Sequence, residues 1–124
     1  MKKAVQGTTP AGAYSPGVIA EGRFVYVSGQ ASLRDGAVVS GTVEEETRAA
    51  LANIGAVLAE ARAGFEDVVR VGIYLADIGD FAAMNEVYAE IMPAPYSART
   101  TIGADLPGIK VEIDCVAVLP ESGT

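Results

Sequence analysis

The pattern of hydrophobic and polar residues predicts several β-strands. Residues 23–29 are rich in aromatic and β-branched residues, which favour strands. Residues 68–75 alternate, so that every second side chain, beginning with Val69, shares one face. Residues 99–104 and 110–119 predict two further strands late in the chain. The Asp35-Gly36 pair predicts a tight turn that leads into a short strand at 37–39.

A first helix is predicted after Thr42. Thr42 and Glu45 have the spacing of a capping box, in which each side chain accepts a hydrogen bond from the other residue's backbone N–H. Arg62 and Gly64 predict the end of this helix, with Gly64 just past it. Apolar residues with helical spacing form one stripe along it: Leu51, Ile54, Leu58 and Ala61.

A second helix is predicted after the turn at 77–80, where Asp80 can cap it, and it ends before Pro93. Its hydrophobic side is formed by Phe81, Met84, Tyr88 and Ile91. Residues 1–16 are rich in glycine, proline and threonine and predict an irregular lead-in. The order of strands and helices indicates an α+β fold, with two helices packed on one face of a mixed β-sheet.

Length and composition predict one domain over residues 1–124. The chain is 50% hydrophobic and 20% charged, against about 25% charged residues in average soluble proteins. Such a low charge content indicates either a surface that is hidden in an oligomer or a sequence that is rich in alanine and glycine.

The net charge of −7 and the scattered cations disfavour nucleic acid as a partner, because phosphate binding requires clustered lysine and arginine. A single cysteine, Cys115, excludes an internal disulfide and fits a reducing cytoplasm, where we expect the protein to reside. No apolar run follows Lys2 and Lys3, so we expect no signal peptide. No run approaches the roughly 18 apolar residues of a membrane span, so no membrane partner is expected.

The chain contains no histidine, which restricts proton chemistry near neutral pH to carboxylates and a few other groups. In the strand predicted at 110–119, Glu112 and Asp114 share a face with Val116 and Val118. The simplest reading of two carboxylates on a strand is an exposed polar face. Their apolar neighbours suggest instead that something covers this face, and a second subunit is the simplest cover.

Arg99 is the candidate group for binding an anion, because a guanidinium can bind a carboxylate with two parallel hydrogen bonds. A structural salt bridge or a solvated arginine is the alternative. Tyr14 could line a pocket or anchor a turn. The Ser28-Gly29 pair could admit a ligand close to the backbone or could only end a strand.

We expect neither a metal site nor a cofactor. Without histidine, only carboxylate-rich sites could bind a metal, and no calcium-loop spacing is present. No glycine-rich phosphate loop occurs either. Cys115 lies on the apolar face of its predicted strand, and we expect it to be a core residue and not a nucleophile.

Taken together, the chain resembles the RidA/YjgF family of imine and enamine deaminases. The matching segments, in family order, are GAYSPGV (12–18), VYVSGQ (25–30), ETRAALANIGAVL (46–58), DVVRVGIYL (67–75), DFAAMNEVY (80–88), ARTT (98–101) and LPGIKVEIDCVA (106–117). They cover nearly the whole chain, and their combination is far more specific than any one of them. Asp114 stands where a glutamate is common, and Thr101 where some members have cysteine.

The resemblance implies a chorismate-mutase-like subunit, a homotrimer with sites in the clefts between subunits, and no cofactor. It implies that Arg99 binds the substrate carboxylate and that Glu112 positions the attacking water. The remaining positions that would line the pocket are Tyr14, Ser28, Gly29, Asn85 and Thr101.

The activity implied is hydrolysis of 2-imino acids or their enamine tautomers, such as 2-iminobutanoate and 2-iminopropanoate, to 2-keto acids and ammonia. One alternative is a trimer that senses a small molecule or binds a protein without catalysis. Another is a deaminase for a specialised catabolic enamine of the aminoacrylate or aminomuconate type. A ribonuclease, a role long attached to the family, is disfavoured by the acidic charge and the lack of histidine.

Overall fold

The structure is a computed structural model that describes residues 1–121. The strands are β1 (Lys2–Val5), β2 (Gly17–Ala20), β3 (Phe24–Gln30), β4 (Leu33–Arg34), β5 (Ala37–Val38), β6 (Val68–Leu75), β7 (Ala98–Gly103) and β8 (Val111–Val118). The helices are α1 (Val43–Glu60) and α2 (Phe81–Ile91), and short 3-10 helices occupy Phe65–Asp67 and Ile78–Asp80.

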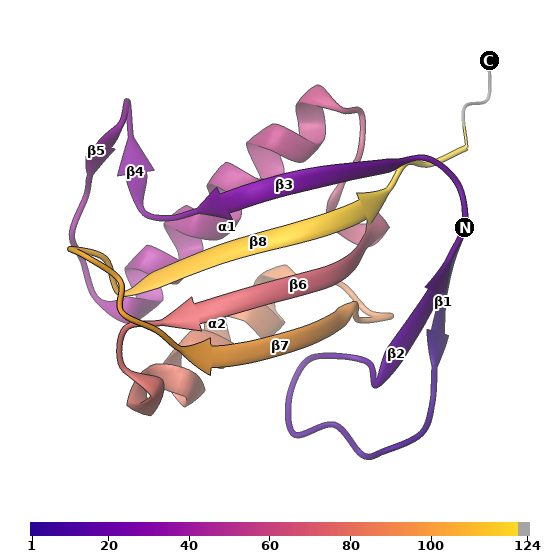
Figure 1. Ribbon diagram of the computed structural model, residues 1–124, viewed down its shortest axis with the longest axis horizontal. Helices are drawn as coiled ribbons and strands as arrows, with labels where there is room; N and C mark the ends of the chain where they lie inside the picture. The colour runs from indigo at the N-terminus through magenta and orange to yellow at the C-terminus, as the bar shows by residue number, and fades with distance from the viewer. Residues whose placement is uncertain (122–124) are drawn as a thin grey trace.

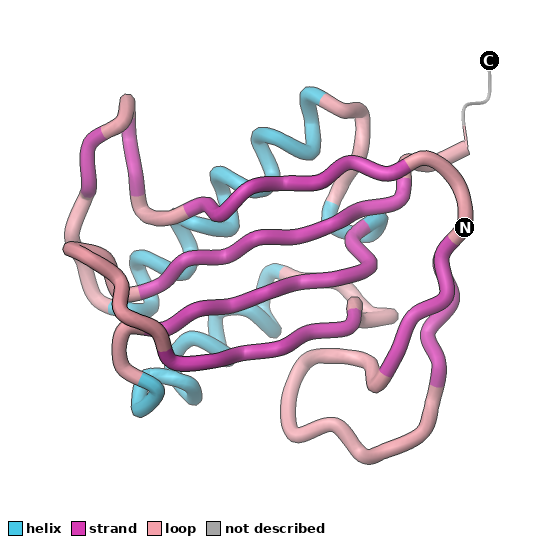
Figure 2. The backbone as a smooth tube through the Cα atoms, in the orientation of Figure 1, coloured by secondary structure: helices cyan, strands magenta, loops and turns pink. Residues whose placement is uncertain are grey.

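The central sheet has the strand order β3-β8-β6-β7. β8 is antiparallel to both of its neighbours, β3 and β6, whereas β6 and β7 are parallel. Both helices lie on the same face of this sheet, and the other face carries no helix in the described residues (Figures 1 and 2). The expectation of a mixed α+β fold with two helices on one face of the sheet is therefore confirmed.

The hydrophobic core lies between the sheet and the two helices. On β8, Ile113 and Cys115 face the helices, and their register partners on β6, Ile73 and Val71, face the same way. Each fully buried aliphatic side chain stabilises the fold by about 1.5–3 kcal/mol. The largest fully buried side chains include Tyr88, Leu51, Ile54, Leu58, Ile73, Leu75, Met84 and Ile113.

The predicted capping box begins α1. The Thr42 hydroxyl accepts from the Glu45 N–H at 3.1 Å, and the Glu45 carboxylate accepts from the Thr42 N–H at 2.9 Å. The end of the helix differs from the prediction, because Arg62 and not Gly64 adopts the left-handed conformation, with φ of 60°. The Ala63 N–H donates to the Leu58 carbonyl at 2.9 Å, which is the Schellman bond that closes the helix earlier.

The lead-in is more regular than predicted. Residues 1–16 contain β1, which pairs antiparallel with β2 to form a hairpin beside the central sheet (Figure 1). The prediction of an irregular segment is right for residues 6–16, which form no helix or extended strand, and wrong for Lys2–Val5, a short strand that lacks a run of alternating apolar residues. The tight turn at Asp35 and Gly36 is present, with φ of 52° and 80°, and joins β4 to β5.

Asp80 occupies the N-cap position of α2 but makes no side-chain capping bond. The preceding 3-10 helix is capped instead by Asp77, whose carboxylate accepts from the Gly79 N–H at 2.8 Å. The prediction that Asp80 caps α2 through its side chain was therefore wrong.

A buried carboxylate fixes the start of β8. Glu46 on α1 is only 1% exposed and accepts from the backbone N–H of Lys110 at 2.9 Å and of Gly41 at 3.3 Å. The Lys110 ammonium lies 3.4 Å from the same carboxylate. These contacts hold β8 in register two residues before Glu112. Among the described helices, none is long and apolar enough to cross a bilayer.

Candidate active site

Arg99 lies on β7 with its side chain on the helix side of the sheet. Its register partner on β6 is Val71, whose partner on β8 is Cys115, and both are core residues. Arg99 is only 8% exposed. Its Nη1 donates to Oδ1 of Asn85, on α2, at 2.7 Å. The fold therefore holds a guanidinium in the interior, beside a helix.

Three aromatic rings surround this guanidinium. Its central carbon lies 4.7 Å from the ring centre of Tyr88, 5.3 Å from that of Tyr14 and 5.6 Å from that of Phe81. Ring faces attract a cation, and each such contact contributes about 0.5–2 kcal/mol. Burial lowers the pKa of Arg99, and Tyr88 and Tyr14 oppose that shift. The group remains a cation because arginine does not lose its proton in proteins.

Within residues 1–121, Arg99 forms no salt bridge, so its buried charge has no anionic partner there. Its Nη2 is buried and makes no hydrogen bond to any other described residue. Thr101, two residues along β7 on the same face, also has a buried hydroxyl without a partner. Buried polar atoms are nearly always paired, so two unpaired ones so close together indicate a place for a small polar ligand.

The turn before β2 lies over Nη2 of Arg99, the guanidinium nitrogen that has no hydrogen-bond partner in the described residues. Ser15 pins it to the segment before β7: its N–H donates to the Ser97 carbonyl at 3.0 Å, and its hydroxyl donates to the Tyr96 carbonyl. Gly12 packs directly against the Arg99 cluster, where a Cβ would lie 3.2 Å from the Asn85 amide and 3.4 Å from Nη2. Gly12 is therefore among the residues that enclose Nη2, together with the surrounding aromatic rings.

Glu112 lies on the opposite face of the sheet. On β8 it is paired with Tyr74 of β6, and its side chain extends over Gly29 of β3. A Cβ on Gly29 would lie 2.8 Å from Cδ of Glu112 and would overlap its Oε2. Ser28 and Gly29 occupy a register irregularity of β3, where two residues stand opposite one on β8.

The predicted site residues thus form two groups in one chain. The arginine group, on the helix side, consists of Arg99, Asn85, Thr101 and Tyr14. The glutamate group lies on the face of the sheet that carries no helix, which we call the open face, and consists of Glu112, Ser28 and Gly29. Within one chain the sheet separates the two groups.

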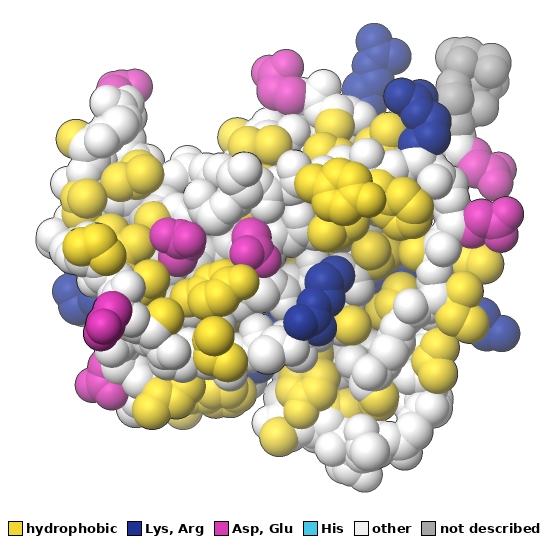
Figure 3. Space-filling view, viewed as in Figure 1, with side chains coloured by type: hydrophobic (Ala, Val, Ile, Leu, Met, Phe, Trp, Pro, Cys, Tyr) yellow, Lys and Arg dark blue, Asp and Glu magenta, His cyan; other side chains and the backbone are white. Residues whose placement is uncertain are grey.

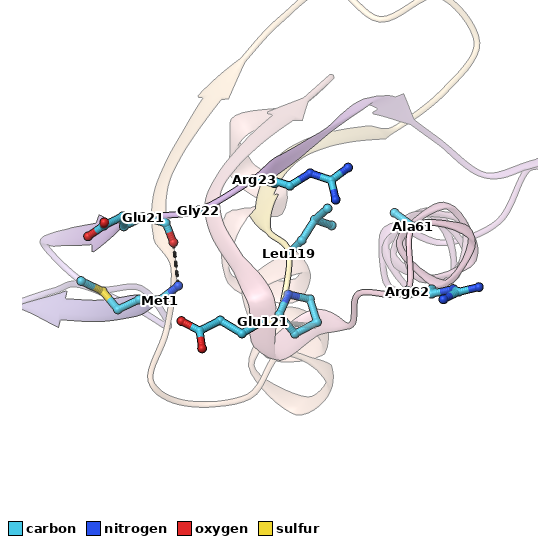
Figure 4. Close-up of a pocket in the computed structure, with 9 residues that line it drawn as sticks. Met1, Glu21, Gly22, Arg23, Ala61, Arg62, Leu119 and Glu121 are labelled. Atoms are coloured by element: carbon cyan, nitrogen blue, oxygen red, sulfur yellow. Dashed lines mark hydrogen bonds between the residues drawn. The ribbon is translucent and has the colours of Figure 1, made fainter. Parts of the chain in front are cut away.

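Two surface cavities occur elsewhere. The first, of about 610 Å³, lies near the end of α1 and includes Arg23, Arg62 and Leu119 (Figure 4). The second, of about 650 Å³, lies by the 3-10 helix at Ile78–Asp80. Neither includes a residue of the arginine group or of the glutamate group.

The open face of the sheet is rich in apolar side chains. Tyr26 is 75% exposed and Ile102 47% exposed, and Phe24 is also exposed on this face. Figure 3 shows hydrophobic side chains spread over the sheet, with carboxylates among them. An apolar area of this kind on one face indicates a surface that binds another protein.

Sequence reasoning placed Phe81 and Tyr88 in the core and did not assign them to the site. The spacing along α2 could have indicated their role. Asn85 follows Phe81 by four residues and precedes Tyr88 by three, so a polar side chain lies in the apolar stripe of α2. Cys115 is buried in the core, as expected, and burial raises its pKa to about 12. The described residues contain no cluster of acidic or sulfur ligands able to hold a metal ion.

Comparisons with known proteins give the family. A family model described as Endoribonuclease L-PSP matches residues 4–119. The mitochondrial protein mmf2 of Schizosaccharomyces pombe is 46% identical over 104 residues, which cover 80% of this chain and 82% of that protein. A 2-iminobutanoate/2-iminopropanoate deaminase of Capra hircus is 41% identical over 111 residues, covering 86% of this chain and 80% of that protein.

A solved structure agrees with these relatives. The crystal structure of RidA from an Antarctic Psychrobacter superposes with a TM-score of 0.73 at 29% identity, covering 92% of this chain and 94% of that chain. The chain therefore belongs to the Endoribonuclease L-PSP family, the family of the RidA and YjgF proteins.

Proposed function

We propose that this protein is a hydrolytic deaminase that converts 2-imino acids and their enamine tautomers to 2-keto acids and ammonia. The observation that carries the proposal is Arg99, a buried cation with one free amine and no carboxylate partner in residues 1–121. Such a group fits the carboxylate of a small organic acid. The deaminase name of the Capra hircus relative supports the reaction type.

We further propose a homotrimer with a chorismate-mutase-like subunit, in which the arginine group of one subunit meets the glutamate group of the next. Two features support this arrangement. The two groups lie on opposite sides of the sheet, so a shared site requires two chains. The open face also exposes several apolar side chains, as expected of a surface that a second copy of the chain covers in a subunit interface.

In this site, Arg99 binds the substrate carboxylate through Nη2 and a second N–H of its fork. Asn85 holds the guanidinium plane by accepting from Nη1. The aromatic rings exclude water, which strengthens the ion pair. The Thr101 hydroxyl, free in the single chain, is available for the substrate or its water.

Glu112 acts on the attacking water. As the water oxygen bonds to the imine carbon, its proton passes to the Glu112 carboxylate. When the imine is protonated, this step gives a neutral carbinolamine. Glu112 then returns the proton to the amine nitrogen, the C–N bond breaks with its electron pair leaving on ammonia, and the hydroxyl proton passes to the carboxylate. The hydroxyl becomes the carbonyl of the 2-keto acid. A positioned base of this kind accelerates a reaction by about 10²–10⁴. Backbone groups at Ser28 and Gly29, next to the Glu112 side chain, would orient the water.

The test is 2-iminobutanoate hydrolysis, with the imine generated in place by an amino-acid oxidase. Arg99→Ala should abolish the acceleration while the oligomer stays intact. Glu112→Gln should slow turnover and preserve binding of a 2-keto acid. Undiminished activity of Arg99→Ala would refute the proposal. Loss of keto-acid binding in Glu112→Gln with normal turnover would show that the two roles are exchanged.

Two other activities give different results in the same experiment. A sensor that only binds small acids would hold a 2-keto acid at Arg99 and release no ammonia. A deaminase for a specialised enamine would turn over an aminoacrylate faster than 2-iminobutanoate. We do not propose RNA cleavage, because the chain has 9 basic and 16 acidic residues and no histidine. Residence in the cytoplasm stays a prediction; the S. pombe relative is named as mitochondrial.

A further inference from the structure

The two carboxylates on the open face of β8 lie over different neighbouring strands. Glu112 extends over Gly29 on β3, and Asp114 extends over Gly72 on β6. A Cβ on Gly72 would lie 2.5 Å from Oδ1 of Asp114. Because each carboxylate uses the space that a missing side chain leaves, the two groups turn away from each other.

Tyr74 completes the place that Asp114 occupies. Its hydroxyl donates to Oδ2 of Asp114 at 3.0 Å and would lie 2.9 Å from a Cβ on Gly72. The bond to Asp114 is the largest cause of a raised pKa of Tyr74, so the phenol keeps the proton that it donates. The missing side chain of Gly72 therefore leaves room for the Asp114 carboxylate, and Tyr74 donates a hydrogen bond to it.

We propose that Gly72 and Tyr74 are positioning residues that hold Asp114 away from Glu112, so that a single carboxylate faces the substrate. The inference rests on the proposed function, because it assigns a role relative to the water held by Glu112. Side chains two residues apart on a strand share a face, and two carboxylates there repel each other when water is excluded. The substrate is itself an anion, so a second carboxylate turned toward it would also oppose its binding.

Besides the two carboxylates, Arg70 on β6 acts on this part of the open face, and its charge opposes the rise in the pKa of Tyr74 that the bond to Asp114 causes. Thr100 and Ile102 of β7, which face the same side, are uncharged. The Lys110 ammonium is engaged by Glu46. The Arg70 guanidinium donates to the Thr100 hydroxyl at 2.8 Å. The remaining titratable group is Tyr26 on β3, which makes no side-chain hydrogen bond in the described residues. The direct contacts of the Asp114 carboxylate are the hydrogen bond from Tyr74 and the space beside Gly72.

The experiment adds a side chain where Asp114 lies. Gly72→Ala should displace the carboxylate and lower kcat/KM for 2-iminobutanoate about ten-fold, as one misplaced like charge would. The loss should fall more on KM than on kcat, because the substrate is an anion. Gly103→Ala on β7 is the matched control, since a Cβ there would meet Ile78 at 3.6 Å and the Leu75 carbonyl at 3.8 Å, both ordinary contacts.

Removing the Asp114 carboxylate distinguishes a positioning role of Gly72 from a purely structural role in the strand. The double variant Gly72→Ala/Asp114→Ala should return to within about twofold of Asp114→Ala alone, because no carboxylate remains to be displaced. A strand merely distorted by the new methyl group would stay impaired in the double variant, and that result would overturn the inference.

Tyr74→Phe provides a test that adds no atoms. It should raise KM in the same direction as Gly72→Ala, and Asp114→Ala should again restore it. Tyr26→Phe is its control on the same face. Unchanged kinetics in both Gly72→Ala and Tyr74→Phe, with an active wild type, would overturn this inference alone. A wild type that releases no ammonia from imines would overturn the proposed function and this inference with it.

Discussion

Replacing Arg99 with methionine should separate the stability of the fold from the function of the site. Methionine has a similar length and no charge, and it packs well against aromatic rings. In the wild type, the guanidinium is buried, holds Asn85 and lies against three rings, while Nη2 makes no hydrogen bond. The substitution therefore removes contributions that stabilise the fold together with one that destabilises it.

For stability these contributions nearly cancel. The charged hydrogen bond to Asn85 contributes about 1.5–3 kcal/mol, and the three ring contacts, which share one cation and do not add in full, about 2 kcal/mol together. Against this, the unpaired buried amine costs about 1–3 kcal/mol, and the methionine side chain adds apolar packing. We expect the free energy of unfolding to change by no more than about 2 kcal/mol, which shifts Tm by less than about 8 °C.

For function the loss is large. Two charge-assisted hydrogen bonds to the substrate carboxylate contribute about 3–6 kcal/mol together. At about 1.4 kcal/mol for each factor of ten, kcat/KM should fall by about 10²–10⁴. The assay pairs thermal unfolding at a fixed protein concentration with ammonia release from 2-iminobutanoate. Arg48→Met is the control, because Arg48 forms an exposed salt bridge with Glu90 and should change neither quantity much.

Two results would refute this reasoning. If Arg99→Met unfolded the protein, the arginine would be a structural element and not a binding group. If the variant kept wild-type kcat/KM, the carboxylate of the substrate would bind elsewhere.

Three further substitutions or reagents test separate parts of the structure. Thr42→Ala removes half of the capping box with Glu45 and should lower the free energy of unfolding by about 1 kcal/mol; an unchanged denaturation midpoint would contradict the cap. Gly29→Ala should displace Glu112, lowering kcat about a hundred-fold while the Kd of a 2-keto acid stays the same, and undiminished turnover would remove Glu112 from the chemistry. Burial raises the pKa of Cys115 to about 12, so at mildly alkaline pH the folded protein should react with a thiol reagent far more slowly than the unfolded chain; rapid labelling of the folded protein would contradict the buried position.

Much of the fold was predictable because its signals are local. The capping box at Thr42 and the alternation along β8 depend only on neighbouring residues, and both appear in the structure. The hairpin of β1 and β2 was missed because each of its strands has only four residues and neither shows a run of alternating apolar residues. The stop of α1 was misplaced because Arg62 takes the left-handed position that favours glycine.

The candidate site was predictable as separate residues and not as an arrangement. The alternation along one strand gives the face of Glu112 relative to Cys115. The face of Arg99 relative to Glu112 depends on β6, which lies between β7 and β8 and sets both registers. No local pattern contains that information, so the separation of the two groups by the sheet was found only in the structure.

The most direct test of a site shared between subunits is a mixed assembly of two inactive variants. Arg99→Ala and Glu112→Gln chains would be unfolded together in equal amounts, refolded, and assayed for 2-iminobutanoate hydrolysis. Where an intact Arg99 of one chain meets an intact Glu112 of the next, activity should return, at about a quarter of the wild-type sites in a randomly assembled ring. If the mixture stays as inactive as each variant alone, although the chains have mixed, the site does not lie between subunits.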